Sequence, residues 1–213
     1  MSDPGEAIRR RGNTRRRLIA AAAHLFETSG TIAQSVEDIS RQAGFTRGAF
    51  YSNFATVDEL YLAVHQEQAA IVWGRLGSAL DAQLSGEHPH AGLDEAVGHL
   101  LESIPESREW FSLRTVLLSK AAADASFART MTIDGGEAVS QLGERFAALA
   151  ALHGRVSVVE ASVLAKAVVS AHVGAVSLSP VDADTARTQR VVVAAVLRGL
   201  TVESSDAGQL AQS

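Results

Sequence analysis

Thr46, Arg47 and Gly48 lie within the stretch VEDISRQAGFTRGAFYSNF (residues 36–54), and these residue types suit contact with nucleic acid. A threonine hydroxyl caps a helix or meets a phosphate, and an arginine fork binds the O6 and N7 atoms of guanine. A glycine destabilises a helix by roughly 1 kcal/mol relative to alanine, which makes sense where the helix must lie close to DNA. The stretch therefore predicts a DNA contact.

The elements that must position these residues are predicted to be two helices joined by a tight turn. Ser35, with Asp38 three residues later, forms a variant of the capping box that begins the first helix, and Gly44 ends it with left-handed backbone. Thr46 then caps a short helix that runs through Phe54. This arrangement is typical of a helix-turn-helix motif, in which the start of the second helix reaches base edges in the major groove.

Phe50 and Phe54 are four residues apart and are predicted to face inward, whereas Tyr51 points away and offers its hydroxyl to the sugar-phosphate backbone. A generic helical hairpin is the alternative interpretation. The two capped helices, the glycine turn and the arginines upstream together favour the DNA-binding interpretation.

Charge is distributed unevenly along the 213 residues. The net charge of −5 argues against a nucleic-acid partner, but the first 55 residues hold eight arginines against five acidic residues, which leaves −8 for the remainder. A basic head on an acidic body suggests that only the head meets phosphate. A solvated tail is the alternative for the arginine-rich start.

The chain has no cysteine, which excludes disulfides and thiolate metal sites and favours a reducing compartment. No apolar run reaches membrane-spanning length, and the arginine-rich start does not read as a secretory signal. These features predict a soluble, cytoplasmic protein that does not contact a membrane.

Helical spacing of apolar residues recurs along the rest of the chain, and no long alternation typical of a strand is found. A first helix is predicted within residues 14–30, and Thr56 with Glu59 begins a long fourth helix that carries two apolar faces and holds the functional boundary. Ser157 with Glu160 is predicted to begin another helix. The downstream helices are expected near residues 92–104, 106–122, 125–152 (with a break at Gly135–Gly136), 157–178 and 184–202.

Residues 14–64 together resemble the N-terminal domain of TetR/AcrR-type transcriptional regulators, without gaps. The resemblance implies an all-α fold of about nine helices in a homodimeric, ligand-responsive repressor of a palindromic operator on double-stranded DNA. It implies a basic arm over residues 1–13, a helix-turn-helix domain over 14–55, and a helical ligand-binding and dimerisation domain over 56–213.

The resemblance also assigns roles to individual residues. Ser35 and Tyr51 match phosphate-binding positions, and Asn53 matches a variable position that often faces the backbone. Val57 stands where the family often has a lysine, so that phosphate contact is either missing or supplied by Arg15, Arg16 or Arg17. The predicted DNA-binding residues are Arg15, Arg17, Ser35, Thr46, Arg47, Gly48, Tyr51 and Asn53.

The expected helix 106–122 carries Trp110, Arg114 and Leu117 on one face. An aromatic wall with one cation suits an apolar ligand that bears an acid or a carbonyl, although Trp110 and Phe111 are more typical of a core. The predicted ligand-binding residues are Trp110, Phe111, Arg114, Leu117, Phe127, Met131 and Phe146.

The last two expected helices, near residues 157–178 and 184–202, are dense in Val, Ala and Gly, which suits either the core or a subunit interface. The family pairs these helices across its dimer. The predicted dimer-interface residues are Leu164, Val168, His172, Val192 and Val196.

Glu95, His99 and Glu102 share a helical face, but apolar residues occupy the opposite face, so the three are predicted to meet solvent and not a metal. No catalytic constellation and no cofactor site is predicted. Two other functions stay open at this point: a ligand-independent architectural DNA-binding protein, and an enzyme that carries a helix-turn-helix head.

Overall fold

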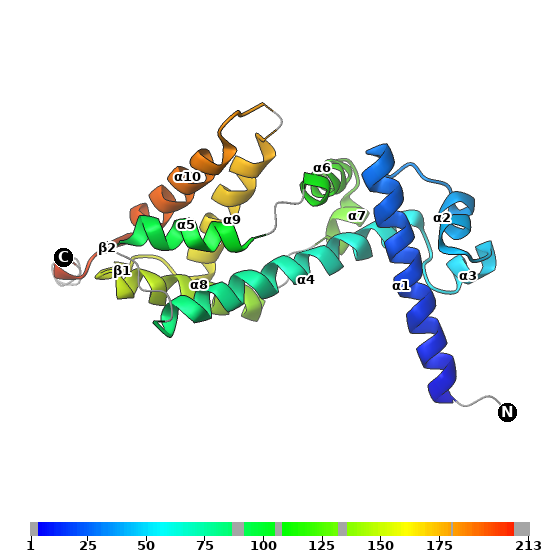
Figure 1. Cartoon of the computed structure of the whole chain (residues 1–213), viewed down its shortest axis with the longest axis horizontal. Helices are drawn as coiled ribbons and strands as arrows, with labels where there is room; N and C mark the ends of the chain where they lie inside the picture. Colours follow the sequence, from blue (N-terminus) through cyan, green and yellow to red (C-terminus); the bar gives the residue numbers. More distant parts are fainter. Residues whose placement is uncertain (1–3, 87–91, 105–107, 132–135, 180, 207–213) are drawn as a thin grey trace. The chain divides into compact units, whose positions relative to one another are not determined.

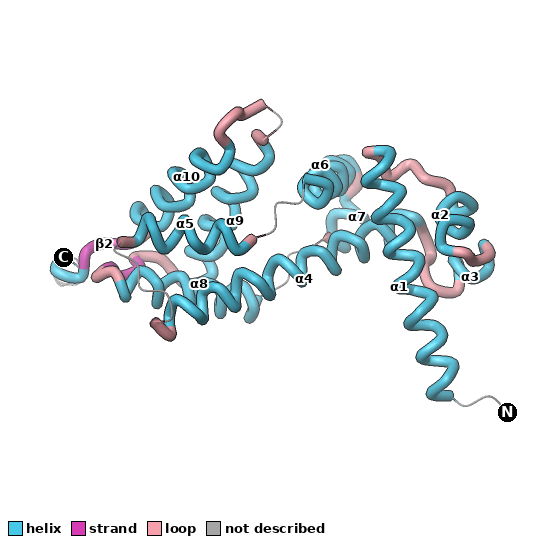
Figure 2. Tube along the Cα trace, in the orientation of Figure 1, coloured by secondary structure: helices cyan, strands magenta, loops and turns pink. Residues whose placement is uncertain are grey.

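The computed structural model describes residues 4–86, 92–104, 108–131, 136–179 and 181–206. The fold of these residues is all-α, with one short antiparallel pair of strands (Figures 1 and 2). Its helices are α1 (Pro4–Ser29), α2 (Val36–Ala43), α3 (Arg47–Tyr51), α4 (Val57–Leu84), α5 (Leu93–Ser103), α6 (Arg108–Ala123), α7 (Ala125–Thr130), α8 (Gly136–Leu152), α9 (Ala161–Ser177) and α10 (Thr185–Gly199). The strands are β1 (Arg155–Ser157) and β2 (Thr201–Glu203).

The chain divides into two compact units, and the division lies between Ile71 and Val72, inside α4. The N-terminal unit comprises Met1–Ile71 and Ser107–Thr132, and the C-terminal unit comprises Val72–Glu106 and Ile133–Ser213. Helices α6 and α7 therefore belong with α1–α3, which the sequence did not predict. The fourth helix holds the division, as its two apolar faces indicated.

Local signals fix the start and end of the helices around the turn. Ser35 Oγ accepts the backbone N–H of Asp38 at 3.1 Å, and Thr46 Oγ1 accepts the N–H of Ala49 at 3.3 Å. Gly44 has φ of 72°, a left-handed conformation that costs a non-glycine residue roughly 1–2 kcal/mol. The predicted caps and turn are confirmed.

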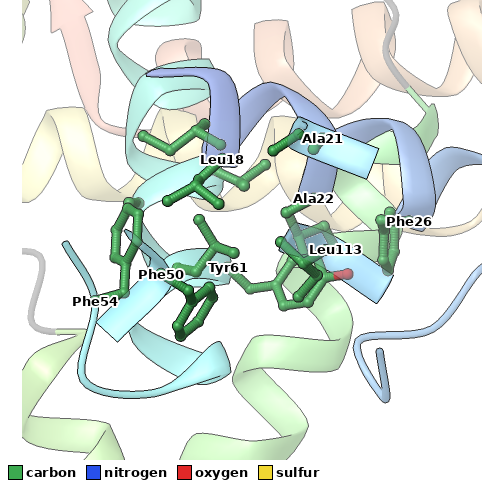
Figure 3. Close-up of a cluster of buried hydrophobic side chains, with 14 of the residues drawn as sticks. Leu18, Ala21, Ala22, Phe26, Phe50, Phe54, Tyr61 and Leu113 are labelled. Atoms are coloured by element: carbon green, nitrogen blue, oxygen red, sulfur yellow. The ribbon is translucent and has the colours of Figure 1, made fainter. Parts of the chain in front are cut away.

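The core of the N-terminal unit is built from buried side chains of its helices (Figure 3). Phe50 and Phe54 of the motif are buried among Leu18 and Ala22 of α1 and Tyr61 of α4. Leu113 and Leu117 of α6 and Phe127 of α7 complete the same cluster. Burial of each large apolar side chain contributes about 1.5–3 kcal/mol, so this core holds the motif rigidly.

The C-terminal unit is built around α8, α9 and α10, with α5 packed on α10. Gly143 of α8 lies where α9 begins, and a Cβ atom there would stand 1.8 Å from the carbonyl oxygen of Ala161. Only glycine permits this approach of the two backbones. Arg145 Nε donates to Asp81 Oδ1 at 2.8 Å, and that bond ties α8 to the end of α4.

Four sequence expectations about helix boundaries were wrong. Helix α3 ends at Tyr51 and does not run through Phe54. Helix α1 begins at Pro4 and not near Thr14, since proline is favoured at the first position of a helix. Ser157 does not begin a helix: it lies in β1, and its hydroxyl donates to the carbonyl of Val159 at 2.9 Å. The last expected helix stops at Gly199, because residues 201–203 pair with β1.

Candidate nucleic-acid interface

The first turn of α3 presents Thr46, Arg47 and Gly48 to solvent. The buried rings of Phe50 and Phe54 fix which side of the helix faces outward, and Tyr51 is 52% exposed on that outer side. An exposed helix start that carries an arginine, a hydroxyl and a phenol has the donors that recognise base edges and phosphates.

Arg47 contacts two side chains of its own protomer. Its guanidinium forms an ion pair with Glu37 of α2, and its Nη2 atom lies 3.5 Å from Tyr51 Oη. The contact with Tyr51 and the charge of Glu37 raise the pKa of Arg47, so this side chain is charged throughout the physiological range. Glu37 is a residue that sequence reasoning missed, because the pairing joins positions ten residues apart across the turn.

Gly48 is not required by the packing of the protomer. A Cβ atom at this position would lie 3.7 Å from Thr46 Oγ1, an ordinary van der Waals contact, and its φ is not left-handed. The fold therefore leaves room for a side chain on the outer edge of α3. A partner molecule that approaches this edge of α3 closely would explain why the position is a glycine.

Arg17, which was predicted to contact phosphate, supports the motif from behind. Its Nη2 atom donates to the carbonyl of Ala43 at 2.8 Å, at the end of α2, and its guanidinium lies 4.7 Å from the ring centre of Phe45. The same Nη2 atom stands 3.0 Å from the Cβ that a substituted Gly44 would carry. Arg17 thus clamps the turn.

Two other arginines of α1 also contact the motif. The Arg15 guanidinium lies 4.4 Å from the ring centre of Phe54, and Arg11 Nη2 donates to the carbonyl of Ser52 at 3.0 Å. Both side chains are exposed, so their charge stays available to a phosphate near the same surface.

The remaining predicted DNA-binding residues lie at the edges of this surface. Ser35 is exposed, and its hydroxyl donates to Asp38 Oδ2 at 2.6 Å. Asn53 is half-buried, and its Nδ2 atom donates to the carbonyl of Ala49 at 2.8 Å, which closes the end of α3. Val57 packs against the core of the N-terminal unit.

Most of the predicted ligand-binding residues lie in the N-terminal unit. Trp110 and Phe111 are buried and meet edge to face, with ring centres 4.7 Å apart. Trp110 also stacks on His65 of α4, a residue that the sequence did not single out, with ring centres 5.6 Å apart. Leu117, Phe127 and Met131 belong to the core of the same unit, whereas Phe146 belongs to the core of the C-terminal unit.

The predicted dimer-interface residues differ in exposure. Leu164 and Val168 are 0% and 3% exposed and pack within the core of their own C-terminal unit. Val192, Val196 and His172 are only half-buried. The exposed apolar side chains on the same helices are Val163 and Val191.

Among the residues that the structure describes, no group of three or more acidic or histidine side chains is placed to hold a metal ion. His99 and Glu102 of the weighed triad are exposed and lie 3.6 Å apart. Likewise, no helix in the described ranges has the length and hydropathy needed to cross a membrane.

Comparison with known proteins places this surface in a family. Residues 18–64 match the model of the bacterial regulatory proteins of the tetR family. The chain is 31% identical over 90 residues to the transcriptional regulator AcrR of Shigella flexneri, a match that covers 42% of this chain and 41% of AcrR. It is 27% identical over 115 residues to the transcriptional repressor AcnR of Corynebacterium efficiens, over 54% of each chain. The match thus spans about half the length of these relatives.

Two solved structures share the fold over most of their length. A TetR-family regulator from Mesorhizobium loti is 20% identical, with a TM-score of 0.67 over 90% of this chain and 98% of that chain. The protein RolR, solved in complex with resorcinol, is 22% identical, with a TM-score of 0.57 over 96% of this chain and 95% of that chain. The named relatives are transcriptional regulators and not enzymes, which agrees with the absence of a predicted catalytic constellation. The tetR-family model thus matches α1–α3 and the start of α4, so the chain is similar to TetR/AcrR-type transcriptional regulators in this domain and shares its fold with solved TetR-family structures.

Proposed function

We propose that this regulator is a cytoplasmic homodimeric repressor that holds a palindromic operator and is released by a small, largely apolar ligand. The observation that carries the proposal is the outer edge of α3. Arg47 and Gly48 are exposed there on a helix whose other side is anchored by Phe50 and Phe54. A rigid helix with an exposed arginine at its start suits the major groove of B-DNA.

The need to discriminate between DNA sequences favours a dimer. The described part of α3 is only five residues long, so one protomer reads few base pairs. Two recognition helices on the two halves of a palindrome double the number of contacts that discriminate between sequences. Helices α9 and α10 are proposed to join the protomers through Val163 and Val191, which are exposed, with His172, Val192 and Val196 half-buried. Val192 and Val196 also pack against the core of their own unit.

Ligand release is supported by two observations. RolR, whose fold this chain shares, was solved with a small aromatic molecule, resorcinol. In this chain Trp110, Phe111 and Arg114 lie on α6, and Leu117, Phe127 and Met131 belong to the core of the same unit. A ligand releases the operator only if it binds the form that cannot grip DNA more tightly than the form that can. The domain division proposed here keeps residues 1–13 as a basic arm, 14–55 as the DNA-binding domain, and 56–213 as the domain for ligand and dimer.

The test is selection of bound sequences from random duplex DNA with the purified chain, followed by sedimentation of the complex on the selected site. The proposal expects an enriched inverted repeat with two protomers on each site. Enrichment of no sequence would contradict DNA recognition, and one protomer on a single half-site would contradict the dimer.

A further inference from the structure

Two pairs of side chains, each pair spaced one helical turn apart, come from α4 and α6 within the N-terminal unit. Tyr61 and His65 lie on α4, and Trp110 and Arg114 lie on α6. His65 and Trp110 stack with an interplanar angle of 17°. Arg114 is close enough for its charge to help lower the pKa of His65, although burial is the larger cause. Tyr61 and Trp110 are buried, His65 and Arg114 are half-buried, and the four residues are named here the α4–α6 cluster.

Hydrogen bonding in the α4–α6 cluster is incomplete among the described residues. The Nε2 atom of His65, the Nε atom of Arg114 and the hydroxyl oxygen of Tyr61 are all buried, and none has a hydrogen-bond partner. Leaving a buried polar atom without a partner costs about 1–3 kcal/mol, and more when the group is charged. Such atoms are rare in native proteins and indicate a missing water, ion or ligand.

The donor character of these atoms selects an acceptor. Burial lowers the pKa of His65 to about 4, so its ring is neutral near pH 7, and its Nε2 atom is then free to carry the proton. The Nε atom of Arg114 always carries a hydrogen and never accepts. These two donors, on helices that meet at the stack of His65 on Trp110, fit a ligand atom that accepts hydrogen bonds.

The charge of Arg114 selects an anion. Burial lowers the pKa of Arg114, and the described residues supply no carboxylate that pairs with it. An arginine does not lose its proton inside a protein, so its charge persists and needs a counter-ion. A carboxylate matches a guanidinium in shape as well as in charge. The adjacent rings of Trp110 and Phe111 suit a flat apolar body attached to that carboxylate.

We propose that His65 and Arg114 bind the carboxylate of a small aromatic acid, whose ring lies against Trp110. The acid's role as the releasing ligand rests on the proposed function, but its binding does not. Helix α6 also sends Leu113 and Leu117 into the core that buries Phe50 and Phe54 (Figure 3). An acid that moves Arg114 thus acts on a helix that packs directly on the DNA-binding motif.

Binding is measured through the fluorescence of Trp110. The chain has two tryptophans, and Trp73 is 39% exposed, so the full-length Trp73→Phe variant reports on Trp110 alone. Benzoate, phenylacetate and cinnamate are titrated, each against its neutral primary amide. We expect saturable binding of at least one acid, with the matching amide at least about tenfold weaker, because the amide lacks the charge that Arg114 recognises.

Variants separate the site from the fold. Arg114→Gln is expected to weaken binding of the acid by about tenfold or more, and Arg114→Lys by less, because lysine keeps the charge without the fork. Arg75→Gln, an exposed arginine on α4, is the matched control and leaves binding unchanged. Circular dichroism melting shows whether each variant is folded. If Arg114→Gln does not fold, binding is compared between Arg114→Lys and the wild type instead.

Three results would overturn the inference: no acid binds, acid and amide bind equally, or Arg114→Gln and Arg75→Gln bind alike. Water would then be the partner of these atoms. Operator binding is measured separately, without acid. Loss of sequence-specific DNA binding would contradict the proposed function and leave the acid site standing, whereas failed acid binding beside intact operator binding would contradict the acid site alone.

Discussion

In the proposed complex, Arg47 meets DNA from an existing contact and not as a free side chain. Its guanidinium must leave Glu37 before both prongs of the fork reach a guanine. Exposed ion pairs of this kind are weak in water, so a well-placed guanine displaces the carboxylate and a wrong base does not. We therefore expect Glu37 to compete with DNA for Arg47 and to disfavour poorly matched sequences.

Replacing Glu37 with glutamine tests this competition. The substitution removes a negative charge beside the DNA-binding edge and frees Arg47, so binding to unrelated DNA should tighten by several-fold, and more than binding to the selected operator. Fluorescence anisotropy on both duplexes at one salt concentration measures the ratio. Glu27→Gln, which removes an equal charge from an exposed position on α1, is the control. If the ratio of the affinities for the operator and for unrelated DNA is the same in Glu37→Gln and Glu27→Gln, Glu37 has no role in sequence recognition.

His65 and His172 should make stability depend on pH. Burial lowers the pKa of each to about 4 in the folded chain, from 6.5 in the absence of burial. The unfolded chain therefore takes up protons below about pH 6.5 that the folded chain refuses. The free energy of unfolding is fully retained above that pH and falls as the pH drops toward 4.

Urea unfolding at about pH 7 and about pH 5 measures this loss. The double variant His65→Gln/His172→Gln should lose less stability between the two pH values than the wild type. His99→Gln, at an exposed histidine of α5, should behave as the wild type does. A double variant with the pH dependence of His99→Gln would show that other groups cause the loss.

Two glycines that are four residues apart have opposite roles in the helix-turn-helix element. At Gly44, φ is left-handed and Arg17 fills the space where a side chain would extend. At Gly48 the backbone is helical, and the space around it within the protomer is open beyond Thr46. The first glycine serves the fold, and the second serves an approach from outside.

Alanine at each position separates these roles. Gly44→Ala should lower the free energy of unfolding by about 1–2 kcal/mol, because alanine disfavours left-handed backbone. Gly48→Ala should raise it by about 0.5–1 kcal/mol, since alanine favours a helix, and should nevertheless weaken operator binding. Urea unfolding and anisotropy are measured on both variants. A Gly48→Ala variant that binds the operator as tightly as the wild type would show that α3 does not approach DNA at that edge.

Sequence reasoning succeeded for elements that rest on local geometry. The caps at Ser35 and Thr46 and the turn at Gly44 each depend on residues within a few positions, so their spacing was enough. It failed where distant segments meet. The pairing of residues 155–157 with 201–203 and the stacking of His65 on Trp110 join positions more than forty residues apart, and no local pattern signals either contact.

The candidate site was predictable to a similar extent. Arg47, Gly48 and Tyr51 lie on one exposed edge, as the alternation of inward and outward residues in a short helix indicated. The role of Arg17 was not predictable, because an exposed arginine and an arginine bound to the carbonyl of Ala43 have the same local sequence. For the same reason, the sequence could not distinguish a subunit interface from a core at Leu164 and Val168, and both are buried in the core of the protomer.

At the scale of the whole molecule, assembly should depend on the exposed positions of α9 and α10. Val163 and Val191 are 45% and 59% exposed, so Val163→Asp and Val191→Asp should fold and yet sediment as monomers. Val168→Asp buries a charge in the core and should unfold the protomer instead. Leu152→Asp, at an exposed leucine that ends α8, is the control and should remain a dimer. Folded dimers of Val163→Asp and Val191→Asp would contradict the proposed interface.

If α3 reads DNA sequence through Arg47, loss of this arginine should weaken binding to the operator far more than binding to unrelated DNA. The dissociation constant is measured for the selected operator and for a scrambled duplex, with the wild type, Arg47→Ala and the control Arg41→Ala, at an exposed arginine of α2. Loss of a fork on guanine should cost roughly tenfold to a hundredfold on the operator and far less on the scrambled duplex, so that the ratio collapses in Arg47→Ala alone. Equal losses on the two duplexes would make Arg47 a contact to the backbone and would contradict the claim.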